Sequence, residues 1–298
     1  MSDARRRGLG LALALPPVVL LAVFVGIPVV LAVGFSLGHV GGLNATIARI
    51  GTDTRVATSW WGTTQAWADV FADPRFVRDL VVTVGVTVVS TVVVVATSLG
   101  IALNLRLRGG CLATAFAGLA VVPLFIPVVI ASWAITTFYS SDGAVRTAAA
   151  LVGLDGPTWS YSVTAVVIGS VWTSLPFATL MASSGLQAVP DAMIEAARDA
   201  GASTASLVVR VMLPLAAVPV VIATTFTAIG VLGQFTVPYF TGPNAPSVLG
   251  VDISKYFQSF DRPQESVVMA VVVFVLASGV GAVYVGTAFR SAQTAGRA

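Results

Sequence analysis

Long apolar runs separated by short polar segments dominate the pattern along this chain. A helix needs about 20 mostly apolar residues to cross the hydrocarbon core, because each residue rises only about 1.5 Å. Valine is frequent in these runs, but they are longer than the roughly 10 alternating residues of a barrel strand and apolar on every side. The pattern therefore predicts an all-α integral membrane protein with six transmembrane helices, at residues 9–35, 80–105, 112–138, 163–186, 213–235 and 267–289.

Composition supports the same fold class. Of 298 residues, 56% are hydrophobic and only 10% are charged, and the mean hydropathy is +0.92. A soluble domain carries about 25% charged residues, so too few charges are present here to cover a water-exposed surface. A soluble enzyme is therefore excluded. The first apolar run is longer than the core of a signal peptide, which spans about 7–15 residues, so we interpret it as a retained span.

The placement of basic residues indicates the topology. Arg5–Arg7 precede the first span, which favours a cytoplasmic amino terminus. Arg106, Arg108 and Arg290 also lie against span ends on the predicted inner side, whereas Arg78 lies on the outer side and opposes this assignment. We expect a single membrane domain over residues 1–298 with both termini cytoplasmic. The predicted outer stretches are 36–79, 139–162 and 236–266.

The first outer stretch is rich in aromatic residues, namely Trp60, Trp61, Trp67, Phe71 and Phe76. Amphipathic rings favour the membrane–water interface, where one edge meets lipid and the other meets water. A loop that simply packs on itself explains the same residues equally well, so both interpretations stay open at this stage.

Several functions are excluded by residues that the sequence lacks. The only lysine, Lys255, stands between Ser254 and Tyr256, so the Gly-Lys-Ser/Thr step of a phosphate-binding loop is missing. The predicted spans contain no central carboxylate, because Asp79 and Glu265 lie at outer margins, and such acids are common ion sites in coupled carriers. With one cysteine and one histidine, the chain offers no catalytic or metal-binding cluster. Energy for uphill transport would therefore come from another subunit.

The polar segment 187–212 separates the fourth and fifth predicted spans. Pro190 and Asp191 are typical of a helix start, and Gly201 is placed to end the helix. Ser203 can cap a second turn that leads toward Pro214. This pattern predicts a short helix of about three turns at the cytoplasmic surface. From the residues alone, an ordinary surface helix is a somewhat better interpretation than a knob that fits a partner's groove.

Three regions resemble a known family. The first runs from Trp172–Phe177 through Gly185–Pro190 to Glu195, and it is similar to the carbohydrate-type branch of the type I ABC importer permeases. That branch includes maltose, trehalose and glycerol-phosphate systems. Phe71–Phe76 and Thr241–Pro243 match it as well, so the resemblance covers most of the chain from about residue 61 to 289. The long early outer loop is similar to that of the first permease of a heterodimeric pair.

The resemblance implies a fold, a coupling loop and partners. The fold would be that of a type I ABC importer permease, and segment 187–212 would be the EAA loop through which the permease contacts its ATPase. The expected ATPase-coupling residues are Glu195, Ala196, Ala197, Arg198, Asp199, Gly201, Leu213 and Pro214. Expected partners are a second EAA-containing permease, two copies of a cytoplasmic ABC ATPase and an extracytoplasmic substrate-binding lipoprotein, in a bacterial cytoplasmic (inner) membrane whose lipid surrounds the multi-pass chain. No nucleic acid is expected. The chain itself would bind no cofactor, because ATP and Mg²⁺ belong to the ATPase.

The sequence also departs from the family pattern. The loop reads Asp199-Ala200-Gly201-Ala202, whereas the family usually has an Asp-Gly-Ala step, so the acidic residue here is displaced by one position. Val208 replaces an aromatic residue before the closing Leu-Pro, and a double glycine is reduced to Gly242. These departures concern the details of ATPase contact and of the outer gate.

Candidate substrate contacts lie on two spans. On the fourth span, Ser170, Thr173, Ser174 and Phe177 recur at helical spacing and share one face. Three hydroxyls and one ring suit a sugar, and the resemblance implies that such positions face the substrate. On the fifth span, Thr227, Gly230 and Gln234 align similarly. The alternative is that these hydroxyls bond their own helix or bridge neighbouring helices.

Taken together, the sequence predicts a permease subunit that moves a sugar or sugar-like solute by alternating access, without bond chemistry of its own. Two other classes are weighed against it. A secondary carrier without an ATPase is disfavoured by the missing mid-span acids, and a membrane enzyme or assembly factor by the missing catalytic cluster.

Overall fold

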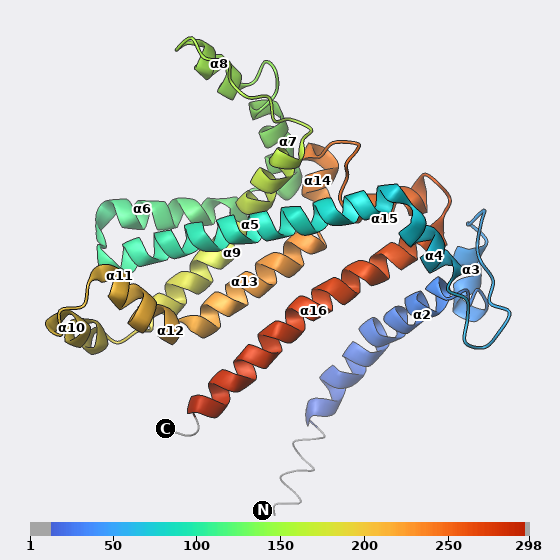
Figure 1. Cartoon of the computed structure of the whole chain (residues 1–298), viewed down its shortest axis with the longest axis horizontal. Coiled ribbons are helices and arrows are strands. Elements are labelled where there is room, and N and C mark those ends of the chain that lie inside the picture. The colour runs from blue at the N-terminus through green and yellow to red at the C-terminus, as the bar shows by residue number, and fades with distance from the viewer. Residues whose placement is uncertain (1–12, 296–298) are drawn as a thin grey trace, which may run out of the picture. The chain divides into compact units, whose positions relative to one another are not determined.

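The computed structural model describes residues 13–295, with side chains up to residue 286, and every regular element in that part of the chain is helical. Four of these helices are long and apolar enough to cross a membrane (Figure 1). They are Leu13–Ser36, which contains η1 (Ala22–Gly26) and α2 (Ile27–Ser36), α5 (Pro74–Leu107), α9 (Val163–Gln187) and the Pro263–Gly286 part of α16 (Pro263–Ala295). The all-α membrane fold class is confirmed.

The third predicted span is a sharply bent pair of helices. The first arm contains α6 (Gly110–Val121) and η3 (Val122–Phe125), and the second is α7 (Val128–Phe138), at 111° to the first. Ile126 and Pro127 between them have extended ψ angles of 120° and 132°. Proline disfavours the helical conformation of the residue before it, which explains why the helix stops here. In Figure 1, α7 leaves the direction of α5 and α9.

The fifth predicted span is also bent. α11 (Thr204–Leu207), η4 (Val208–Met212) and α12 (Leu213–Leu215) precede Ala216, and α13 (Ala217–Leu232) follows at 77°. Six spans result if each bent pair counts as one. The predicted boundaries shift accordingly: α13 ends at Leu232 rather than 235, and α16 continues to Ala295. Residues 9–12 of the first predicted span lie outside the described part.

The chain divides into two compact units. One holds the residues before Arg78 together with Asp252–Val272, and the other holds Arg78–Val251 and the residues from Val273 onward. The expectation of a single membrane domain stays a prediction. Short helices complete the fold: η2 (Gly42–Asn44), α3 (Ala45–Ala48), α4 (Gln65–Ala72), α8 (Ala144–Ala150), α10 (Asp191–Asp199), α14 (Thr236–Thr241) and α15 (Leu249–Gln258).

Within the first unit, the aromatic stretch divides between two roles. The Trp67 indole donates to Ser36 Oγ at 3.3 Å, and its ring stacks on Phe71, which in turn meets the buried Phe76 edge-on. These three rings therefore pack within the unit. Trp60 and Trp61, by contrast, are about three-quarters exposed and lie against each other. Packing within the unit therefore describes Trp67, Phe71 and Phe76, whereas the interfacial location of Trp60 and Trp61 stays a prediction.

Within the second unit, α9 is the central element and packs extensively on α13. Gly185 allows this close approach, because a Cβ there would lie only 2.8 Å from Pro219. The Thr179 hydroxyl donates to Ser98 on α5 at 3.2 Å in a buried contact. Pro176 is buried inside α9 without ending the helix. Small residues and buried hydroxyls thus hold α5, α9 and α13 together, as is common for membrane helices.

Candidate functional site

Helix α10 has the local structure expected of segment 187–212. Pro190 occupies the N-cap position with an extended backbone, and Asp191 lies in the first turn, where its charge favours the helix dipole. At the other end Gly201 has a φ of +78°, and the Gly201 and Ala202 amides donate to the Arg198 and Ala197 carbonyls. This left-handed stop is the glycine termination predicted from the sequence. The Ser203 hydroxyl then accepts from the Ser206 amide and caps α11.

The two faces of α10 differ. Ile194 is 5% exposed and packs in an apolar cluster with Leu186 and Met212. Glu195, Ala196, Arg198 and Asp199 are exposed, whereas Ala197 is half-buried. In Figure 1, α10 and α11 lie at the end of the second unit where α5 ends and α6 begins. The helix is therefore a knob anchored by Ile194, with Ala197 packed against the same cluster and the charged residues outward.

The last two expected coupling residues lie farther along the loop. Leu213 is half-buried and Pro214 is exposed, both in α12, just before the bend at Ala216. They are therefore part of the bent connection to α13 rather than of the exposed face of α10.

The fourth- and fifth-span candidates meet in a hydrogen-bonded group. The buried Ser170 hydroxyl donates to Gln234 Oε1 at 2.7 Å, and Gln234 Nε2 donates to Thr173 Oγ1 at 3.2 Å. The Thr173 hydroxyl also donates to backbone carbonyls of its own helix. These three residues thus bridge α9 to the link that follows α13, which is close to the helix-bridging role that the sequence left open for them.

Ser174 and Phe177 have a different environment. With Phe226 and Thr227 of α13 they line a pocket of about 210 Å³. The Phe177 and Phe226 rings lie 5.7 Å apart, and Tyr284 of α16 meets Phe226 edge-on at 6.5 Å. Thr227 is 3% exposed, and its hydroxyl has no hydrogen-bond partner among the described residues. Paired rings and an unpaired hydroxyl are suitable for a sugar, whose apolar face stacks and whose hydroxyls need partners.

Sequence reasoning missed Phe226 and Tyr284 and included Gly230, which is exposed and lies outside the group that lines this pocket. Phe226 stands four residues before Gly230, so helical spacing already placed it on the candidate face. Helical spacing alone does not predict the packing of α9, α13 and α16 that brings the Phe226 ring next to Phe177.

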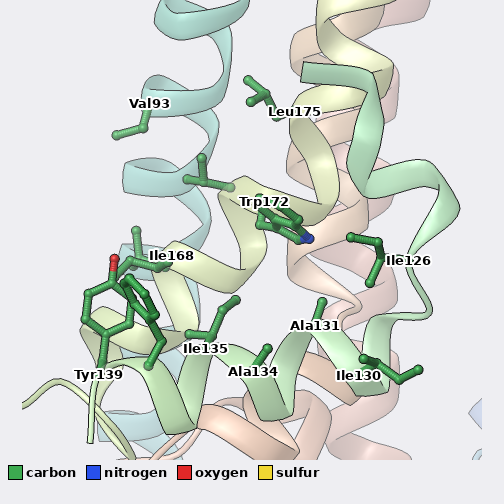
Figure 2. Close-up of a pocket in the computed structure, with 13 residues that line it drawn as sticks. Val93, Ile126, Ile130, Ala131, Ala134, Ile135, Tyr139, Ile168, Trp172 and Leu175 are labelled. Atoms are coloured by element: carbon green, nitrogen blue, oxygen red, sulfur yellow. The ribbon is translucent and has the colours of Figure 1, made fainter. Parts of the chain in front are cut away.

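A larger and almost wholly apolar pocket of about 750 Å³ lies between α7 and α9 (Figure 2). Ile130, Ala134 and Ile135 line it from α7, and Trp172 and Leu175 from α9, as Figure 2 shows. Its lining offers few polar atoms for a sugar. Val171 and Leu175 also line this pocket and are half-buried, because α7 turns back over this face of α9.

A further group of polar residues, which the sequence reasoning did not connect, joins α4, α5 and α15. The Tyr256 hydroxyl donates to Asp73 Oδ2 at 2.9 Å, and Arg75 pairs with the buried Asp252 at 3.6 Å. Arg75 also lies over the Phe260 ring, 5.6 Å from its centre. Burial and the bond to Asp73 raise the pKa of Tyr256 to about 12. Asp73 and Arg75 thus link the end of α4 and the start of α5 to α15 and the residues after it.

The arginine that opposed the topology prediction is also paired. Arg78 Nε lies 3.0 Å from Asp79 Oδ1, and Asp79 also accepts from the Ser247 amide just before α15. The topology rule counts basic residues rather than net charge, so Arg78 still opposes the outer assignment despite this pair.

Bent apolar spans around a hydroxyl-bearing face, with a charged helix exposed at one end, define a polytopic membrane transport component. The chain belongs to the family described as the binding-protein-dependent transport system inner membrane component, whose profile matches residues 93–289. This membership agrees with the resemblance found in the sequence.

Individual relatives are also similar. The sulfoquinovosyl glycerol transport system permease SmoG of Agrobacterium fabrum is 28% identical over 55% of this chain and 54% of its own length. The trehalose/maltose permease MalF of Thermococcus litoralis is 28% identical over 56% and 57%. The chain thus spans about half the length of the curated relatives it matches. A chain in the crystal structure of a bacterial alginate ABC transporter superposes on this chain with a TM-score of 0.72 and 17% sequence identity. The match covers 95% of this chain and 94% of the alginate transporter chain, so the two share the fold.

Proposed function

We propose that this chain is a transmembrane permease subunit of an ATP-driven, binding-protein-dependent ABC importer. The observation that carries the proposal is α10: a helix held at one end of the bundle by Ile194, ended by a left-handed glycine and bearing Glu195 on its exposed face. Such a helix suits a groove on an ATPase, and the family's description as a transport component supports this role.

The substrate we propose is a sugar or a similar neutral polyhydroxyl compound. The pocket of Ser174, Phe177, Phe226 and Thr227 contains aromatic rings and hydroxyls and no ionised side chain. A cationic or anionic solute would leave its charge without a counter-charge there, which is costly in a membrane interior. The relative named as a trehalose/maltose permease supports the same class.

The partners in this proposal are a second permease with its own EAA loop, two copies of an ABC ATPase and an extracytoplasmic substrate-binding protein. ATP and Mg²⁺ would bind to the ATPase, so this chain carries out no hydrolysis. ATP-driven closure of the ATPases would move α10 and switch the bundle between outward and inward openings in a bacterial inner membrane.

A matched pair of variants tests the proposal. The tagged chain is purified from its native membrane as wild type, Glu195→Ala and Asp155→Ala, the last being an exposed acid far along the chain from α10. We expect an Mg²⁺-dependent ATPase activity to co-purify with wild type and Asp155→Ala and to fall at least severalfold for Glu195→Ala. If no ATPase accompanies the wild-type chain, the function is that of a carrier without an ATPase, and the proposal is wrong.

A further inference from the structure

Arg106 makes three polar contacts that join three separate helices. It lies in the last turn of α5, where its side chain is 19% exposed. Nε donates to the Leu186 carbonyl at 3.2 Å, and Nη2 donates to the Val189 carbonyl at 2.9 Å and to Asp191 Oδ1 at 2.5 Å. One guanidinium therefore contacts the end of α9, the link after it and the first residue of α10.

The chemistry of this corner explains the choice of arginine. The last carbonyls of a helix have no partner within it and carry partial negative charge, which a cation satisfies. Asp191 adds a full negative charge at the start of the next helix. Only arginine presents several donors in a rigid, planar fork that can serve two carbonyls and a carboxylate together.

An apolar cluster lies beside this contact. It contains Ala102 of α5, Leu186 of α9 and Ile194 of α10, all 5% exposed or less. The cluster resists separation of the helices but has no directional preference, because apolar packing is non-directional. The hydrogen bonds of Arg106 add the directional preference that this packing lacks.

We propose that Arg106 is a positioning residue that fixes α10 to both α5 and α9, so that a displacement of α10 is passed to both helices. Its effect on the order of α10 stands independently of any partner. Its effect on transport rests on the proposed function, in which α10 is the contact for the ATPase. Through α9 the displacement would reach Ser174 and Phe177, and through Arg106 it would reach α5 as well.

Hydrogen–deuterium exchange of the full chain in lipid nanodiscs tests the ordering of α10. The variants are Arg106→Gln, Arg106→Lys, and Arg108→Gln as the control, since Arg108 is an exposed arginine just after the end of α5. We expect amides of residues 191–199 to exchange about tenfold faster in Arg106→Gln, at wild-type rate in Arg108→Gln, and at an intermediate rate in Arg106→Lys, which keeps the charge but not the fork. Equal exchange in Arg106→Gln and Arg108→Gln, or faster exchange spread equally over α5 and α9, would overturn the proposal.

A second measurement separates this inference from the proposed function. In the complex purified with its ATPase, Arg106→Gln should lower the amount of solute imported per ATP hydrolysed about tenfold, while Arg108→Gln leaves this ratio unchanged. An unchanged ratio in Arg106→Gln overturns the transmission role. If no ATPase accompanies the wild-type chain, the proposed function fails instead, and the exchange experiment still decides whether Arg106 orders α10.

Discussion

At the scale of single residues, the candidate substrate face divides into a bridging part and an open part. Ser170, Thr173 and Gln234 bond to one another, so their polar atoms are already satisfied. Phe177 and Thr227 instead border a pocket, one with an exposed ring and the other with an unpaired hydroxyl. Substitutions in the two parts should therefore have different effects.

Removing the aromatic ring of Phe177 or of Phe226 should weaken transport without preventing folding. We expect Phe177→Ala and Phe226→Ala to reduce uptake about 10-fold or more, because stacking and its associated contacts contribute about 1–3 kcal/mol. Leu180→Ala serves as the control, since Leu180 is a 46% exposed residue of the same helix. Uptake is measured together with assembly of the complex. Equal losses at Phe177 and Leu180 would show that the ring has a packing role only.

Thr227→Val separates binding from stability. Valine has nearly the same shape but lacks the hydroxyl, which here has no partner in the described residues. Removing a buried unsatisfied group should leave the thermal stability unchanged or slightly higher, while uptake falls about 10-fold if the hydroxyl binds solute. A melting curve and an uptake assay on the same preparation check both effects. A drop in stability with normal uptake would assign the hydroxyl to a structural contact.

Tyr256 provides a pH-dependent test outside the spans. Its pKa is raised to about 12, first by burial and then by its bond to Asp73. A phenol with a pKa above its unfolded value of about 10 contributes stability that is complete below pH 10 and is lost as the pH rises toward 12. Stability measured between pH 9 and 12 should therefore fall more steeply for wild type than for Tyr256→Phe. Parallel stability curves for wild type and Tyr256→Phe would contradict the raised pKa of Tyr256.

At the scale of the element, α10 depends on how it ends. Gly201 has a φ of +78°, and a Cβ added there would meet no atom within 4 Å. The cost of a side chain at this position is therefore conformational only and not steric.

Three variants of Gly201 should rank by their tolerance of the left-handed conformation. Gly201→Ala should destabilise the end of α10 by about 1–2 kcal/mol, Gly201→Asn by less, and Gly201→Pro by the most, since proline also removes the amide that bonds to Arg198. Amide exchange of residues 196–202 and ATPase co-purification measure the effect. Equal behaviour of alanine and asparagine would show that the conformation at Gly201 is not what shapes the loop.

At the scale of the whole molecule, the topology is open to direct labelling. We expect a cysteine replacing Asp142 to react only from outside the cell and one replacing Ser203 only from inside. The exposed Cys111 must first be replaced by alanine to remove background reaction. Asp252, in the predicted outer stretch 236–266, is an unsuitable labelling site because it is buried beside Arg75. Outside labelling at Ser203 would overturn the inner location of α10.

The amino-acid sequence by itself determined the class of protein, its apolar spans and the place of α10. Span length and the scarcity of charge follow from the thickness of the membrane, and the start and stop of α10 follow from Pro190 and Gly201, which act locally. Local signals of this kind need no knowledge of distant residues.

Only the tertiary structure decided the pairing of Phe177 with Phe226 and the contacts of Arg106 with α9 and α10. Each depends on residues from different helices, Arg106 being separated from Val189 by 83 positions. Helical periodicity specifies which residues share a face, but in an evenly apolar chain it does not specify which face meets which neighbour, because lipid and protein interior favour the same side chains.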